Sequence, residues 1–286
     1  MANLAVMKTI NDAFAQFKQG LAGIYDTREI ASISLMVLTE IINTSKANIK
    51  AFGDRQLTFA QQNELNGILA QLKTGKPLQY TLGYAEFYGL RFKVNPATLI
   101  PRPETEELVQ WVLDSSPNTN SSILDIGTGT GCIAISLKKN LTNVQVSAMD
   151  VSVDALNTAK ENAVLNEVDV NFIEADILNY TSDKKYSIIV SNPPYVTLED
   201  KIRMHRNVTD FEPHSALFVP EDDPLLFYRA IADFALASLE PDGLLFFEIN
   251  ESFGKETAQL LTDSGFKDVE IRKDLSGRDR MIRSVR

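Results

Sequence analysis

Two short motifs in this sequence could carry chemistry, and the first is a glycine-rich turn. Asp125-Ile126-Gly127-Thr128-Gly129-Thr130-Gly131 begins inside the apolar segment Ser122–Ile126 and continues beyond it. Such a turn lets a ligand approach the backbone, because glycine lacks a Cβ atom and tolerates positive φ. Asp150 ends the next apolar segment, where a carboxylate can accept hydrogen bonds from ribose hydroxyl groups. Together these residues predict a site for a nucleoside cofactor.

The spacing of the glycines indicates which nucleoside cofactor this is. The dinucleotide fingerprint is G-x-G-x-x-G, and its third glycine lies in the following helix. Here the spacing is G-x-G-x-G, and Cys132 stands where that third glycine would fall. S-adenosylmethionine contains a ribose but no pyrophosphate, so it does not need a helix start that holds phosphate. The turn therefore favours S-adenosylmethionine over a nicotinamide dinucleotide, and a methyltransferase over a dehydrogenase.

The second motif is Asn192-Pro193-Pro194-Tyr195, which comes directly after the apolar segment Tyr186–Val190 and Ser191. Two prolines after a strand are ordinary in a loop, but the full order of residues suits a chemical task. Methylation of a planar –NH2 group needs acceptors for both N–H donors. The Asn192 side-chain oxygen can supply one and the Pro193 carbonyl the other. Proline has no N–H that would compete, and Tyr195 can hold the planar group face to face.

This second motif predicts methyl transfer to nitrogen. The two accepted hydrogen bonds draw electron density on the nitrogen away from conjugation and aim it at the sulfonium methyl group. Catalysis then consists of positioning and electrostatics, without a covalent enzyme intermediate. The motif alone leaves two targets open, because it can grip an amide of a protein or the amino group of a flipped adenine or guanine base.

The pair of motifs resembles the class I methyltransferases that act on amino and amide nitrogens. The whole chain resembles the release factor glutamine methyltransferase family, the protein-(glutamine-N5) methyltransferases. The segments specific to this resemblance are Gln79–Gly83, Phe87–Gly89, Leu99–Glu106, Phe211–Pro213 with Ala216-Leu217, and Asp274–Arg280. The resemblance implies methyl transfer from S-adenosylmethionine to N5 of the glutamine in the Gly-Gly-Gln motif of peptide chain release factors, with S-adenosylhomocysteine as the second product.

The resemblance also implies a role for each residue of the two motifs. The glycine-rich loop would surround the methionine part of the cofactor, Asp150 would bind the ribose, and Asp176 and Ile177 would lie at the adenine. The residues expected to bind the cofactor are Gly127, Thr128, Gly129, Thr130, Gly131, Asp150, Asp176, Ile177 and Asn192. Those expected to bind the target glutamine are Asn192, Pro193, Pro194 and Tyr195, and the ones counted as catalytic are Asn192, Pro193 and Tyr195.

Two departures from the family pattern lie near the expected site. The family often has a glycine-rich segment after Ala216-Leu217, whereas this chain has Phe218–Pro224. A glycine commonly follows the acidic end of the strand at Leu244–Glu248, but here Glu248-Ile249 leads to Asn250. Neither departure involves the residues expected to hold the nitrogen. We therefore expect them to change the shape of the lid over the site and not the reaction.

The elements around the motifs predict the fold. After a polar loop that ends at Ser122, apolar strands alternate with amphipathic helices, which is typical of a largely parallel sheet covered by helices on both faces. With the resemblance, this predicts an α/β fold: a Rossmann-like, seven-stranded class I methyltransferase sheet with a small N-terminal helical domain. The expected domains are 1–76 (helical, substrate recognition), 77–114 (hairpin linker and helix) and 115–286 (S-adenosylmethionine-dependent methyltransferase).

The charge of the chain bears on the choice of target. The formal net charge is −10, with 28 Lys and Arg against 38 Asp and Glu. Binding to phosphate backbones depends on Lys and Arg that displace counterions, so this chain is a poor non-specific binder of nucleic acid. We therefore expect a protein substrate and keep base methylation as the alternative. A non-enzymatic protein that kept only the fold is disfavoured because both motifs are intact.

The remaining expectations concern location, metals and assembly. No segment approaches the roughly 18–20 uninterrupted apolar residues that cross a bilayer, so we expect no membrane contact. The single cysteine, Cys132, fits a reducing cytoplasm. His205 and His214 are the only histidines and have no cysteine nearby, so no metal site is expected. Nothing in the sequence requires more than a monomer.

Overall fold

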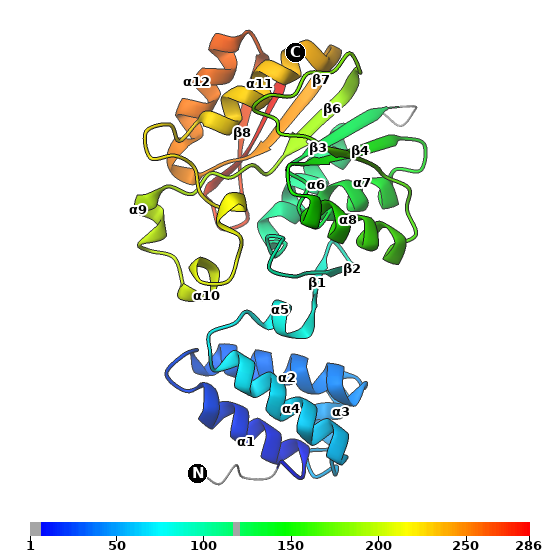
Figure 1. The fold of residues 1–286 in the computed structure, drawn as a ribbon, viewed down its shortest axis with the longest axis vertical. Coiled ribbons are helices and arrows are strands. Elements are labelled where there is room, and N and C mark those ends of the chain that lie inside the picture. Colours follow the sequence, from blue (N-terminus) through cyan, green and yellow to red (C-terminus); the bar gives the residue numbers. More distant parts are fainter. Residues whose placement is uncertain (1–6, 117–120) are drawn as a thin grey trace. The chain divides into compact units, whose positions relative to one another are not determined.

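The computed structural model describes residues 7–116 and 121–286 (Figure 1), which fall into two compact units. The first unit holds the described residues up to Gly83 together with the segment Arg206–Phe211, and it is helical. The second unit, Tyr84–His205 and Glu212–Arg286, holds the sheet. The domain boundaries expected from the sequence, at 76 and 114, stay a prediction.

The helical unit has its own apolar core. Its helices are α1 (Ile10–Leu21), α2 (Thr27–Ile42), α3 (Lys46–Ala51), α4 (Phe59–Leu72), α5 (Leu78–Leu82) and α10 (Arg206–Thr209). Capping boxes start α1 at Thr9 and α4 at Thr58. In each, the threonine hydroxyl accepts from the backbone N–H three residues later, and the side chain of that later residue accepts from the threonine N–H. Phe17, Val37 and Leu65 are fully buried between the helices, so this unit buries apolar surface without the sheet.

The second unit begins with a hairpin and continues into one large sheet. The hairpin is β1 (Tyr84–Phe87) and β2 (Leu90–Lys93). The strands of the sheet are β3 (Ser122–Ile126), β4 (Gln145–Asp150), β5 (Asn171–Glu174), β6 (Tyr186–Ser191), β7 (Leu239–Glu248), β8 (Lys267–Lys273) and β9 (Asp279–Val285). Their order is β5-β4-β3-β6-β7-β9-β8, parallel except for β9, which is antiparallel to both of its neighbours. The α/β fold with a seven-stranded sheet is thus confirmed.

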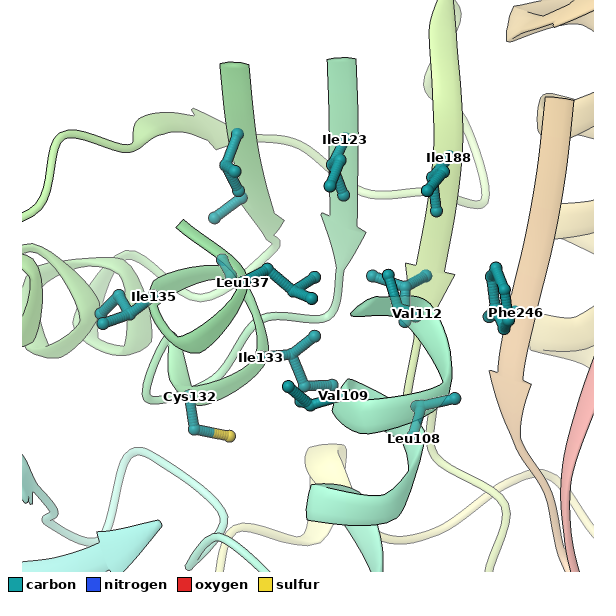
Figure 2. Close-up of a cluster of buried hydrophobic side chains, with 14 of the residues drawn as sticks. Leu108, Val109, Val112, Ile123, Cys132, Ile133, Ile135, Leu137, Ile188 and Phe246 are labelled. Carbon is teal, nitrogen blue, oxygen red and sulfur yellow. The ribbon is translucent and has the colours of Figure 1, made fainter. Parts of the chain in front are cut away.

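Helices cover both faces of this sheet. The longer ones are α6 (Pro103–Ser115), α7 (Cys132–Asn140), α8 (Val153–Leu165), α11 (Leu226–Ser238) and α12 (Gly254–Ser264), and the short ones are α9 (Leu198–Lys201), η1 (His214–Ala216) and η2 (Glu251–Phe253). Figure 2 shows the face covered by α6 and α7, where Val112 and Ile133 point toward Ile123, Ile188 and Phe246 on the strands. The opposite face packs against α11 and α12. Burial on both faces explains why the central strands are almost continuously apolar.

The strand order places the two motifs beside each other. The chain starts the sheet at β3, moves outward through β4 to β5, and then returns to β6 on the other side of β3. Where connections leave neighbouring strands in opposite directions, a crevice forms at their carboxyl ends. The glycine-rich turn follows β3 and Asn192 follows β6, so both motifs lie at this crevice.

A buried carboxylate anchors the start of the glycine-rich turn. Asp125, in β3, is fully buried, and its Oδ2 accepts from the Thr128 hydroxyl at 2.6 Å and from the Ala134 N–H at 3.2 Å. Its Oδ1 has no hydrogen-bond partner among the described residues. Burial raises the pKa of Asp125 to about 7, although the two hydrogen bonds lower it. The folded chain therefore keeps this proton over a pH range in which the unfolded chain has already released it.

This raised pKa predicts a pH-dependent stability that Asp125→Asn should remove. Because the folded-state pKa lies above that of the unfolded chain, wild-type stability falls as pH rises from about 4 to about 7. At pH 8 the variant should have a free energy of unfolding about 2–4 kcal/mol above that of the wild type, with the difference shrinking toward pH 5. Urea unfolding at both pH values measures this, with the exposed Asp183→Asn as control. An equal difference at both pH values would contradict the assignment.

Candidate functional site

Most of the residues expected to bind the cofactor line one cavity at the carboxyl ends of β3, β4, β5 and β6. Those of the expected site that line it are Gly127, Gly129, Asp150, Asp176, Ile177, Asn192, Pro193 and Pro194. Thr128 and Thr130 are buried and do not border the cavity, and Gly131 caps α7. Tyr195 borders a second cavity. The role of each residue stays a prediction.

The glycines of the turn serve two different purposes. Gly127 and Gly129 border the cavity and have φ of 73° and 55°, a conformation that residues with a Cβ atom rarely adopt. Gly131 also has positive φ, and a Cβ atom there would lie 2.8 Å from Ile135 Cδ1 and 3.2 Å from Ala159 Cβ. Gly131 therefore permits close packing of α7 against α8, whereas the other two open the backbone to the cavity.

Asp150 is held in place by the backbone on both sides of it. Its Oδ2 accepts from the Gly129 N–H and its Oδ1 from the Ser152 N–H, each at 2.9 Å. Burial raises the pKa of Asp150, and these backbone hydrogen bonds lower it. Each carboxylate oxygen can accept more than one hydrogen bond. The Asp150 carboxylate is thus a pre-positioned acceptor at the cavity, which is the chemistry that ribose hydroxyl groups require.

The far end of the cavity combines a polar turn with apolar side chains. Asp176 Oδ1 and Oδ2 accept from the Leu178 N–H and the Asn179 amide, each at 3.0 Å, which fixes the turn after β5. Ile177 lies next to it, and α11 contributes Phe227 and Ile231 from a distant part of the sequence. A flat apolar ring with polar edges, such as adenine, fits this combination of side chains. The α11 residues were not predicted. From sequence, an apolar residue of an amphipathic helix that lines a cavity looks the same as one that packs in the hydrophobic core.

The Asn-Pro-Pro-Tyr motif is connected to a buried carboxylate on β7. The Asn192 Nδ2 donates to Thr105 Oγ1 at 3.4 Å, and the Thr105 hydroxyl donates to Glu248 Oε2 at 2.7 Å. The Tyr195 hydroxyl donates to the other oxygen, Glu248 Oε1, at 2.9 Å. Burial raises the pKa of Glu248, whereas these two hydroxyl groups lower it. Neither Thr105 nor Glu248 had been expected in the site, although an acid that ends an apolar strand is the same signal that identified Asp150.

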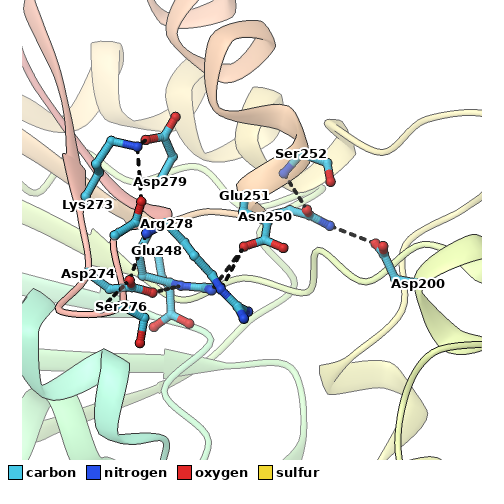
Figure 3. Close-up of polar contacts among 12 residues, drawn as sticks. Asp200, Glu248, Asn250, Glu251, Ser252, Lys273, Asp274, Ser276, Arg278 and Asp279 are labelled. Carbon is cyan, nitrogen blue, oxygen red and sulfur yellow. Dashed lines mark hydrogen bonds and ion pairs between the residues drawn. The ribbon is translucent and has the colours of Figure 1, made fainter.

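Asn250, which follows Glu248 and Ile249, holds the segment after the motif. Its Nδ2 donates to the Tyr195 carbonyl oxygen at 3.0 Å and to Asp200 Oδ2 at 2.9 Å. Figure 3 shows Asn250 between Asp200 and Ser252, whose N–H donates to Asn250 Oδ1. The chain on either side of Phe218 pairs with Val196 through two backbone hydrogen bonds. The segment that follows the motif is thus held by the Asn250 side chain and by backbone pairing of Val196.

A second cavity lies on the other side of the motif and is rich in charge. Asn192, Pro193 and Leu99 line both cavities. The charged residues of the second cavity are Arg102, Asp200, Glu251, Arg278 and Arg280. Figure 3 shows Arg278 close to Glu251, and their side chains approach to 3.5 Å. The motif thus stands between a cavity suited to a nucleoside and a polar cavity suited to another molecule.

The segment Ile100–Arg102 is fixed at this border by a buried acid. Glu212 is almost fully buried, and its Oε1 pairs with Arg102 Nη2 at 2.6 Å. Its Oε2 accepts from the Ile100 N–H at 3.0 Å. This links two of the segments that carry the family resemblance, and it places Leu99 where it borders both cavities.

The described residues offer neither a metal-binding cluster nor a membrane-spanning helix. Within 7–116 and 121–286, no group of three or more His, Cys, Asp and Glu side chains is arranged to hold a metal ion. In the same ranges, no helix combines the length and apolar character needed to span a membrane.

Comparison with known proteins shows which family has this architecture. A family model described as "PrmC N-terminal domain" matches residues 12–83, and one described as "Methyltransferase small domain" matches residues 105–209. A crystal structure of a methyltransferase from Pyrococcus furiosus has the same fold, with a TM-score of 0.52 at 16% identity over 70% of this chain and 90% of that one.

This chain matches two curated relatives over almost its whole length and almost the whole of theirs. The release factor glutamine methyltransferase of Flavobacterium psychrophilum is 50% identical over 274 residues, which cover 94% of this chain and 96% of the relative. The enzyme of the same name from Bacteroides thetaiotaomicron is 41% identical over 279 residues, covering 97% of this chain and 100% of the relative. With both domains matched and half of the residues identical to one relative, the chain belongs to the release factor glutamine methyltransferase family.

Proposed function

We propose that this chain transfers a methyl group from S-adenosylmethionine to the side-chain amide nitrogen of the glutamine in the Gly-Gly-Gln motif of peptide chain release factors. The observation that carries the proposal is the position of Asn192 and Pro193, which line both a nucleoside-type cavity and a polar cavity. A group that joins two cavities in this way can hold the acceptor nitrogen in one while it faces the methyl donor in the other. Family membership supports the same reaction.

The first cavity offers what S-adenosylmethionine requires. Asp150 provides fixed acceptors for the ribose hydroxyl groups, and Gly127 and Gly129 let the methionine portion approach the backbone. Asp176 and Ile177 provide a polar edge and an apolar surface for the adenine. When bound, the cofactor supplies a methyl group on a positively charged sulfur.

The chain itself positions the nitrogen. The Asn192 side-chain oxygen and the Pro193 carbonyl accept from the two N–H groups of the glutamine amide, which concentrates electron density on the nitrogen. Proline cannot donate a hydrogen bond from its backbone nitrogen, so no donor of the motif competes with the amide. Tyr195 is anchored by its hydroxyl to Glu248, which leaves its ring to border the second cavity. Preorganised acceptors of this kind stabilise the transition state without reorganisation.

We place the reaction in the cytoplasm and expect the chain to act as a monomer. The free thiol of Cys132 is consistent with a reducing compartment. The second unit alone contains both cavities, so no second copy is needed to complete the site. Sedimentation of the purified chain checks the second expectation.

The experiment that tests the reaction is methyl transfer from labelled S-adenosylmethionine to a purified release factor. A release factor in which the glutamine of Gly-Gly-Gln is replaced serves as the matched substrate. Label on the first factor alone supports both the reaction and the target. Label on DNA or ribosomal RNA, with none on either factor, would overturn the proposal in favour of base methylation.

The role of Asn192 predicts a large loss of turnover in Asn192→Ala. Loss of one preorganised hydrogen bond in the transition state should lower kcat by about 10²–10³-fold. The dissociation constant for S-adenosylmethionine, measured by calorimetry, should change much less. Turnover within a few-fold of the wild type would contradict the assigned role.

The role of Asp150 predicts the opposite division of effects. Asp150→Ala should weaken binding of S-adenosylmethionine by about tenfold or more, because the variant loses a charged acceptor. At saturating cofactor its kcat should be closer to that of the wild type. The exposed Asp169→Ala is the matched control for loss of a negative charge. An unchanged cofactor dissociation constant in Asp150→Ala would remove Asp150 from the site.

We further propose that the helical unit recognises the release factor. Phe59, at the start of α4, is 77% exposed, and Phe52, at the end of α3, is 61% exposed. Aromatic side chains such as these are enriched in protein–protein interfaces relative to the rest of the surface.

If the helical unit contacts the release factor, Phe59→Ser should raise the KM for the release factor several-fold. It should leave the KM for S-adenosylmethionine unchanged, because Phe59 lies in the other unit from both cavities. Val164→Thr, at a side chain that is 79% exposed on α8, is the control for loss of an exposed apolar group. Steady-state kinetics with intact release factor measures both constants, and an unaltered KM for the release factor would count against this surface.

A further inference from the structure

The buried acid Glu248 controls hydrogen-bond direction around the motif. It lies at the end of β7, is 1% exposed and borders neither cavity. Each of its carboxylate oxygens receives one hydroxyl group, from Thr105 at 2.7 Å and from Tyr195 at 2.9 Å. In both contacts the hydroxyl group donates its hydrogen and the carboxylate oxygen accepts it.

The consequence reaches Asn192 through Thr105. A threonine hydroxyl has one hydrogen, and that of Thr105 is donated to Glu248. The Thr105 oxygen can then only accept, and the group that donates to it is the Asn192 Nδ2, at 3.4 Å. Once the Nδ2 side of the amide is directed at Thr105, the Asn192 Oδ1 is the atom left to accept a hydrogen bond from another molecule.

We propose that Glu248 and Thr105 are positioning residues that fix the Asn192 amide so that its oxygen, and not its NH2 group, meets the target nitrogen. The inference rests on the proposed function, because it concerns the same nitrogen. Neither residue borders either of these cavities, so Thr105 acts through Asn192, and Glu248 acts through Thr105 and Tyr195.

Such control is needed because an amide is nearly symmetric in shape. Its oxygen and its NH2 group differ little in size, and rotation by 180° exchanges them with little steric cost. In the reversed orientation, an NH2 group of Asn192 would face the NH2 group of the target, and two donors would oppose each other. Packing alone does not exclude this state. The reversed orientation would instead place the Asn192 oxygen against the Thr105 oxygen, whose only hydrogen is donated to Glu248.

Two variants of Thr105 separate polarity from packing. Thr105→Ser keeps the hydroxyl group and loses a methyl group, whereas Thr105→Val keeps the shape and loses the hydroxyl. If the hydroxyl orients the amide, Thr105→Val should lower kcat by about 10–100-fold, as expected for a misplaced reacting group. Thr105→Ser should remain close to the wild type, and cofactor affinity should be unchanged in both.

A second readout reports amide orientation directly. A release factor with glutamate in place of the target glutamine presents only acceptors to Asn192, so the wild type should bind it more weakly than the glutamine form. In Thr105→Val the amide can turn its NH2 group outward. The preference for glutamine over glutamate, measured from binding competition, should therefore fall by about tenfold or more. A purely structural role for Thr105 would leave this preference unchanged.

The outcomes distinguish this inference from the proposed function. If the wild type does not methylate the release factor, the proposed function fails. If the wild type is active and Thr105→Val keeps both its kcat and its preference for glutamine, the inference is overturned. Equal losses in Thr105→Ser and Thr105→Val would overturn it as well. Should Thr105→Val not fold, NMR of the wild type decides, because an Nδ2 proton of Asn192 must then show a nuclear Overhauser contact to the Thr105 methyl group.

Discussion

Parallel pairing of β3 with both β4 and β6 is the constraint on which the site depends. Parallel strands end at the same edge of the sheet, so the turn after β3, Asp150 at the end of β4 and Asn192 after β6 must come together there. The reversal of strand order at β3 keeps the connections from closing over that edge. Residues 97–99, η1 and α11 then only have to complete the walls around a crevice that the sheet has already made.

Buried acidic residues fix the segments at this edge of the sheet. Asp125 lies in β3, Asp150 and Glu248 end β4 and β7, and burial raises the pKa of each. Each carboxylate accepts hydrogen bonds from backbone N–H or hydroxyl groups. These donors lie in the glycine-rich turn, at the start of α8 and in the first turn of α6. A buried acceptor that loses such donors is costly, so each acid restricts the positions of the segments around it.

The fold and the motifs could be predicted because their signals are local. The alternation of strands and helices, the G-x-G-x-G spacing and the order Asn-Pro-Pro-Tyr can all be read within short windows of sequence. The contact between Thr105 and Glu248 joins residues 143 positions apart, and the sequence around neither residue predicts it. The same holds for Asn250, which the sequence marks only as a departure and the structure connects to Tyr195 and Asp200. Spacing also cannot show that Gly131 serves helix packing while Gly127 serves the cavity.

One feature of the fold affects how the protein can be made. The segment Arg206–Phe211 belongs to the helical unit, although it lies between parts of the second unit in the sequence. A Cβ atom at Gly75 would lie 3.8 Å from the Phe211 ring, so the late segment lies beside the connection between α4 and α5. Domains usually fold in order as the ribosome releases them. The helical unit therefore receives one segment that is synthesised only after much of the second unit, whereas its buried apolar core comes from residues up to Leu78.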